Sequence, residues 1–199
     1  MKPTIPNLLT LLRIVLIPVL VLVFYLPYKW TNFAAAFVFL LAALTDWLDG
    51  WIARRFDQGS AFGAFLDPVA DKLMVSTALF LIVQAHPTPW MALWAAVIVG
   101  REIAVSALRE WMAEVGKRAR VSVATVGKFK TVVQMVALVC LLYAVSPDRP
   151  VYSDPWMGRA VFIVGDWLLA GAALLTLWSG FEYLRAAWPA LREEQRPRS

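Results

Sequence analysis

The chain contains only one cysteine and one histidine among its 199 residues. Cys140 alone can form neither an intrachain disulfide bond nor a zinc site with several thiolates, and His86 alone excludes a metal site with paired histidines. His86 belongs to the sequence His86-Pro87-Thr88-Pro89 between two apolar runs, which is typical of a turn and favours a loop residue over a general base. Acid–base chemistry must therefore depend on carboxylates, lysine or tyrosine.

Charged residues are also scarce. They make up 17% of the chain, whereas hydrophobic residues make up 60%; an ordinary soluble domain has about 25% charged and 45–50% apolar residues. A membrane-spanning helix needs about 20 predominantly apolar residues, and six runs come close, near 8–26, 31–49, 65–85, 90–110, 128–146 and 158–179. We therefore predict an all-α integral membrane protein in which residues 1–184 form one six-helix transmembrane catalytic domain and residues 185–199 form a polar tail.

The distribution of positive charge predicts the orientation in the membrane. Of the 19 lysines and arginines, only Lys29, Arg149 and Arg159 fall on one side of the six-helix arrangement. The side with the excess of positive charge is expected to be cytosolic, so both termini should be cytosolic. The net charge of +5 then indicates attraction to anionic membrane lipids or phosphorylated substrates, and no nucleic acid is needed to explain it.

Four aspartates stand where the second run ends and the third begins. Asp46 and Asp49 are three residues apart and Asp67 and Asp71 four apart, so each pair shares one helix face. Because antiparallel helices joined by a short loop bring these ends together, we expect the four carboxylates to converge. Ionised acids this close within a membrane are costly, which indicates bound cations. Two divalent ions would balance the charge, and all-oxygen ligands suit Mg²⁺, Mn²⁺ or Ca²⁺. The alternative is that these are ordinary helix-end residues in the headgroup region.

The residues between the two pairs complete a recognisable pattern. Small residues allow a ligand or a helix to approach closely, and Arg54 can neutralise a phosphate. The run Asp46-x-x-Asp49-Gly50-x-x-Ala53-Arg54, followed after eight residues by Gly63-x-x-x-Asp67-x-x-x-Asp71, resembles the signature of the CDP-alcohol phosphatidyltransferase family. The resemblance implies a six-helix, generally dimeric membrane enzyme that displaces CMP from a CDP-linked donor with an acceptor alcohol.

The same resemblance assigns roles to the residues of the motif. Two divalent ions, Mg²⁺ or Mn²⁺, would be held by Asp46, Asp49, Asp67 and Asp71. Asp71 would also be the general base that deprotonates the acceptor alcohol. The CDP-diacylglycerol donor would contact Asp49, Gly50, Ala53, Arg54 and Gly63.

A second, basic cluster predicts the acceptor. Arg109, Lys128 and Lys130 lie within or at the edges of apolar runs, where an unpaired cation is costly; we expect them to bind a phosphate on the acceptor, with Arg118 a further candidate. Arg101 can instead be occupied by a carboxylate. The segments 101–118, 127–131 and 6–18 resemble family members whose acceptor is sn-glycerol 3-phosphate. This resemblance implies that the chain makes phosphatidylglycerophosphate as a homodimer in the bacterial cytoplasmic (inner) membrane, with its active site facing the cytosol.

Two other functions stay open at this point. The acceptor can be a different one, such as inositol phosphate or serine. Intramembrane aspartates also line the paths of divalent-cation transporters, although such acids are expected near the bilayer midplane and on several helices, whereas here they cluster at one end. Asp166, inside the sixth run, has no assigned role beyond local pairing with Arg159 or a headgroup position.

Overall fold

The computed structural model describes residues 5–56, 61–114, 125–146 and 157–194. All regular elements in these ranges are helices: α1 (Ile5–Phe24), α2 (Thr31–Phe56), α3 (Ala61–Ala85), α4 (Pro89–Glu114), α5 (Thr125–Ala144) and α6 (Met157–Glu194). The predicted all-α architecture with six helices is therefore confirmed.

Local sequence explains where α4 begins. Thr88 precedes α4, and its hydroxyl accepts a hydrogen bond from the Met91 backbone N–H at 3.2 Å. Pro89 follows at the first helical position, where its missing N–H costs nothing. His86 lies in the turn before this cap, and its ring packs edge-to-face on Phe162 with the ring centroids 4.9 Å apart. The prediction that His86 is a loop residue is confirmed.

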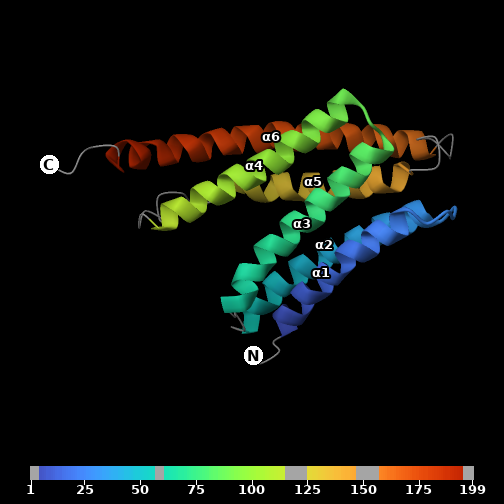
Figure 1. Cartoon of the computed structure of the whole chain (residues 1–199), viewed down its shortest axis with the longest axis horizontal. Coiled ribbons are helices and arrows are strands. Elements are labelled where there is room, and N and C mark those ends of the chain that lie inside the picture. Colours follow the sequence, from blue (N-terminus) through green and yellow to red (C-terminus); the bar gives the residue numbers. More distant parts are fainter. Residues whose placement is uncertain (1–4, 57–60, 115–124, 147–156, 195–199) are drawn as a thin grey trace.

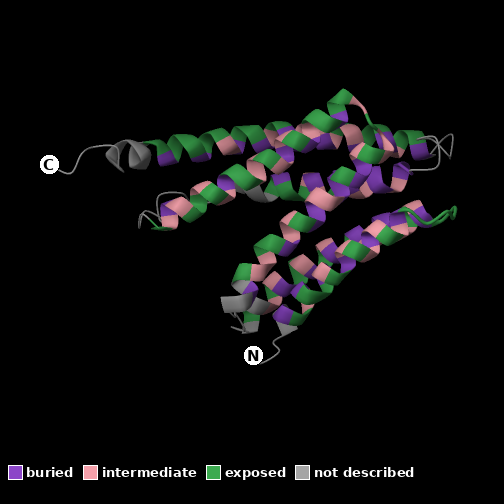
Figure 2. Ribbon diagram, viewed as in Figure 1, coloured by how far each residue is buried: buried purple, intermediate pink, exposed green. Residues whose placement is uncertain are grey.

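The helices pack around one apolar core. α1 lies against α2 and α3, α2 contacts α5, and α6 packs on both α5 and α4. Each of the six helices contributes fully buried side chains to the core, among them Leu20, Phe39, Ile82, Ile98, Leu138 and Leu169. Figure 2 shows exposed residues along the outer faces of all the helices, and many of these are large and apolar, among them Trp47, Phe65, Trp167 and Phe181. An apolar outer surface is what a lipid environment requires.

Four helices are long and apolar enough to cross a membrane. Their spanning segments are Asn7–Phe24, Thr31–Ile52, Pro89–Glu114 and Gly158–Trp188, and α5 contributes a shorter apolar segment, Phe129–Ala144. α3 carries Asp67, Asp71 and Lys72 in its first half and is not among the four. The chain is thus a multi-pass membrane protein, while the orientation of its termini stays a prediction.

Several helices extend beyond the apolar runs. α2 continues to Phe56 and α6 to Glu194, well into the stretch expected to be a polar tail. α3 already begins at Ala61, so Asp67 lies inside this helix. The boundary between a catalytic domain at 1–184 and a tail at 185–199 stays a prediction. In Figure 1 the start of α1, the end of α2 and the start of α3 lie together at one end of the bundle.

α5 and α6 approach closely at a glycine. A Cβ atom added to Gly165 would lie 2.9 Å from the Leu141 side chain, whereas one added to Gly171 would meet nothing within 4 Å. Small residues at such points let helix backbones pack tightly in a membrane protein.

Candidate active site

The aspartate pairs lie on α2 and α3, at the end of the bundle where α1 also begins. Asp49 is buried, whereas the side chain of Asp46 is 41% exposed. Asp46 lies within electrostatic range of both Asp67 and Asp71. The structure therefore brings the four carboxylates into one region.

Two residues of α1 reach into this region. The Arg13 guanidinium is buried and forms ion pairs with Asp46, at 2.8 Å between Nη1 and Oδ1, and with Asp49. One turn earlier, the Thr10 hydroxyl donates a hydrogen bond to Asp67. Sequence reasoning assigned no role to either residue. The sequence feature that indicates a role for Arg13 is its position as a lone cation inside the first apolar run, where an unpaired charge is costly.

The donor set is compatible with divalent cations. Within the described ranges, no three acidic, histidine or cysteine side chains are drawn together tightly enough to form a metal-binding group. Arg13 bridges two of the carboxylates and offsets at most one of the four negative charges. The remaining charge and the all-oxygen ligands fit Mg²⁺ or Mn²⁺.

Asp71 lines two small cavities. One, of about 10 Å³, is shared with Arg13 and Met74, and the other, of about 50 Å³, is shared with Glu102 and Gln134. Asp71 thus borders both a cavity beside Arg13 and a space enclosed by α3, α4 and α5.

A buried polar network joins α4, α5 and α6. Lys130 is 1% exposed, and its Nζ lies 2.8 Å from Oε1 of Glu102. Arg101 pairs with the same carboxylate oxygen at 3.0 Å, as expected for an arginine occupied by a carboxylate, and donates a hydrogen bond of 2.8 Å to Ser179. Gly180 allows this approach, since a Cβ there would lie 3.2 Å from Arg101 Cγ.

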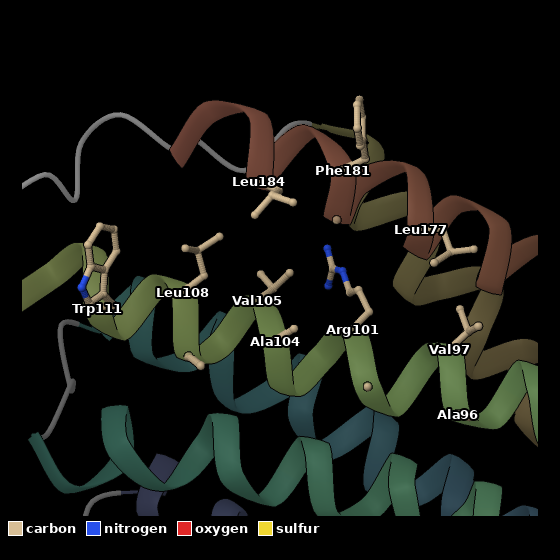
Figure 3. Close-up of a pocket in the computed structure, with 13 residues that line it drawn as sticks. Ala96, Val97, Arg101, Ala104, Val105, Leu108, Trp111, Leu177, Phe181 and Leu184 are labelled. Atoms are coloured by element: carbon tan, nitrogen blue, oxygen red, sulfur yellow. The ribbon is translucent and has the colours of Figure 1, made fainter. Parts of the chain in front are cut away.

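Arg101 also lies in a groove between α4 and α6. Figure 3 shows its guanidinium pointing from α4 toward α6, with Leu177 and Phe181 of α6 nearby. The groove has a volume of about 740 Å³, and its other lining residues are apolar.

Arg109 is held on α6 by Tyr183. Its Nη2 donates a hydrogen bond of 2.6 Å to the Tyr183 hydroxyl, and the guanidinium carbon lies 4.9 Å from the ring centroid. Lys130 is within electrostatic range of Arg101 and Arg109, so these cations share one region of the bundle.

Comparison with known proteins decides the family. A protein-family model described as CDP-alcohol phosphatidyltransferase matches residues 3–178. The chain belongs to the CDP-alcohol phosphatidyltransferase family. The resemblance seen in the sequence is confirmed, and members of this family are generally metal-dependent.

Two relatives within the family are similar to this chain over most of its length. The chain is 54% identical over 193 residues to the CDP-diacylglycerol--glycerol-3-phosphate 3-phosphatidyltransferase of Pseudomonas fluorescens, covering 96% of this chain and 94% of the relative. It is 52% identical over 187 residues to the protein of the same name from Escherichia coli strain K12, covering 94% of this chain and 96% of the relative. The likeness therefore extends over nearly the full length of each protein.

The remaining family-motif positions are only partly visible. Gly50 lies on α2 beside Asp49, and Gly63 is buried near the start of α3. Ala53 and Arg54 belong to α2, and Lys128 to α5, but their side chains lie outside the described part of the structure, as does the whole of Arg118. Their predicted roles in the transferase stay predictions.

Proposed function

We propose that the chain transfers the phosphatidyl group of CDP-diacylglycerol to sn-glycerol 3-phosphate, giving phosphatidylglycerophosphate and CMP. Family membership and more than 50% identity to relatives named for this reaction support the proposal. The observation that carries it is the position of Asp71, which lines one cavity with Arg13, the partner of Asp46 and Asp49, and another cavity with Glu102 and Gln134. A base that borders both regions can meet a donor at the aspartates and an acceptor in the second cavity.

In this proposal Asp46, Asp49, Asp67 and Asp71 hold two divalent ions, Mg²⁺ or Mn²⁺. When bound, the ions offset the negative charge of the pyrophosphate donor. Asp49 also contacts the CDP moiety together with its motif neighbours Gly50, Ala53, Arg54 and Gly63.

Asp71 acts as the general base. Its carboxylate accepts the proton of the attacking hydroxyl as a bond forms between that oxygen and the phosphatidyl phosphorus and the bond to CMP breaks. The hydrogen bond from Thr10 orients the Asp67 carboxylate. The ion pairs with Arg13 hold Asp46 and Asp49 in position on α2.

The acceptor phosphate is held by Arg109, Lys128 and Lys130, with Arg118 a further candidate. Lys130 is already paired with Glu102. A phosphate oxygen must therefore either replace the Glu102 carboxylate at the Lys130 ammonium or share the ammonium with it. The Tyr183 contact holds Arg109 in place for the same phosphate. The enzyme acts as a homodimer in the bacterial inner membrane, with residues 1–184 as the catalytic domain and the aspartates facing the cytosol.

A competition between acceptors tests the proposal. The purified protein in detergent is given CDP-diacylglycerol, Mg²⁺ and equal concentrations of sn-glycerol 3-phosphate, serine and inositol phosphate, and the lipid products are separated. We expect phosphatidylglycerophosphate to dominate and equimolar CMP to be released. Preference for another acceptor would overturn the acceptor assignment, and movement of ions across vesicles without CMP release would favour the transporter alternative.

A further inference from the structure

The cavity on the acceptor side of Asp71 is small and mixed in character. It lies between α3, α4 and α5 and has a volume of about 50 Å³. Its apolar wall is formed by Val75, Ile98, Val99 and Met135, and its polar lining includes Asp71, Lys72, Glu102 and Gln134.

Most of the polar groups around this cavity already have partners. The Lys72 ammonium donates a hydrogen bond to Ser106. Glu102 pairs with Arg101 and Lys130. These contacts hold the Lys72 side chain against α4 and link the Glu102 side chain to α5. None of them explains why a cavity lies beside Asp71.

Gln134 differs from Lys72 and Glu102. Its side chain is on α5 and only 4% exposed, and its Oε1 atom accepts no hydrogen bond from the described residues. Buried amide oxygens are nearly always hydrogen-bonded, because leaving one without a donor is costly. An acceptor atom of this kind, lining a cavity, indicates a ligand with a hydroxyl donor.

We infer that Gln134 binds the second hydroxyl of the acceptor while the first hydroxyl faces Asp71, so that the cavity selects a vicinal diol. This inference rests on the proposed function. A space of about 50 Å³ has room for roughly four water-sized groups, which suits the two carbons and two oxygens of a CHOH–CH₂OH unit.

The position of Lys130 supports the same orientation. Lys130 and Gln134 are four residues apart on α5 and share one helix face, about one turn apart. A ligand with a diol at Gln134 and an anion at Lys130 therefore carries both groups on one short chain. A three-carbon phosphate with two adjacent hydroxyls meets this requirement, whereas serine has no vicinal diol.

The test compares two acceptors that differ by one hydroxyl. sn-Glycerol 3-phosphate and 3-hydroxypropyl phosphate, which lacks the second hydroxyl, are assayed with wild-type protein and with Gln134→Leu. We expect wild type to prefer glycerol 3-phosphate at least tenfold in kcat/KM and Gln134→Leu to show a ratio near one. The KM for CDP-diacylglycerol should be unchanged.

Gln84→Leu provides a matched control. Gln84 is an exposed residue near the other end of α3, and its replacement should leave the wild-type ratio intact. If Gln134→Leu does not fold, Gln134→Met supplies an unbranched side chain of similar length without the amide oxygen and should also give a ratio near one.

The possible failures can be distinguished. A Gln134→Leu or Gln134→Met protein that keeps the wild-type ratio would overturn the inference and leave a bound water as the partner of Gln134. Equal use of both acceptors by wild type would also overturn it, even though the transfer reaction is present. Absence of transfer to glycerol 3-phosphate by folded wild-type protein would instead refute the proposed function.

Discussion

Replacing Arg13 with methionine tests whether this residue is the countercharge for the aspartate cluster. Arg13 is 1% exposed and pairs with Asp49, which is also buried, and with the more exposed Asp46. Breaking a buried ion pair by removing one partner costs about 3–5 kcal/mol. The Asp46 pair adds less, about 0–1 kcal/mol, because that side chain is 41% exposed. We therefore expect the free energy of unfolding to fall by about 3–5 kcal/mol.

The assay is unfolding of the purified protein in detergent, with a metal chelator present. A loss of about 3–5 kcal/mol corresponds to roughly two to four powers of ten in the folding equilibrium and to a melting temperature lower by about 6–20 °C. Arg55→Met is the control, since Arg55 is an exposed arginine further along α2, and its loss should change stability by less than about 1 kcal/mol.

Two further measurements separate the charge effect from loss of packing. Mg²⁺ should stabilise Arg13→Met more than wild type, because the ion supplies the positive charge that the variant lacks. The double variant Arg13→Met/Asp49→Asn should be less destabilised than the sum of the two single variants, because the buried carboxylate left unpaired by the first change is removed by the second. An Arg13→Met protein as stable as Arg55→Met in chelator would refute the countercharge role.

Other substitutions test the base, the acceptor site and the helix packing. Asp71→Asn should abolish CMP release while binding of CDP-diacylglycerol, measured by calorimetry, persists; near-normal turnover would exclude Asp71 as the base. Tyr183→Phe removes the hydrogen bond to Arg109 and should raise the KM for glycerol 3-phosphate about tenfold, with the KM for CDP-diacylglycerol unchanged; a change in both constants would indicate a general effect on packing. Gly165→Ala places a Cβ 2.9 Å from a leucine Cγ on α5 and should lower the free energy of unfolding by about 1–3 kcal/mol. Gly171→Ala meets nothing within 4 Å and should be neutral or stabilising by up to about 1 kcal/mol; equal effects at the two glycines would contradict the close approach of α5 and α6.

The helices were predictable because lipid demands long apolar segments whose backbone hydrogen bonds are internal. Their ends were less so. α6 continues to Glu194, well past the last apolar residues of the sixth run, since a helix can continue beyond the bilayer with its polar side chains in water. Apolar length therefore indicates which residues cross the membrane and says little about where the helix ends.

The grouping of the aspartates followed from local rules. Helical spacing and a short connection bring Asp46, Asp49, Asp67 and Asp71 to one end. The contacts of Arg13 and Thr10 did not follow, because they depend on α1 packing beside both α2 and α3. That arrangement is a property of the tertiary structure, and no spacing within a single segment encodes it.

The basic cluster shows why individual charges are harder to assign than motifs. The sequence predicts that Lys130 binds a phosphate, because a buried cation needs a partner. In the structure its partner is Glu102. The two assignments are compatible if the carboxylate keeps the lysine neutralised until an anionic acceptor arrives. The acceptor would then bind in exchange for an existing ion pair, so part of its Coulombic attraction is offset by the lost contact. Arg109 donates its hydrogen bond to a tyrosine hydroxyl, and within the described part of the chain it has no carboxylate partner to give up when it binds phosphate. Of the described cations, Arg109 is therefore expected to contribute more to acceptor affinity than Lys130.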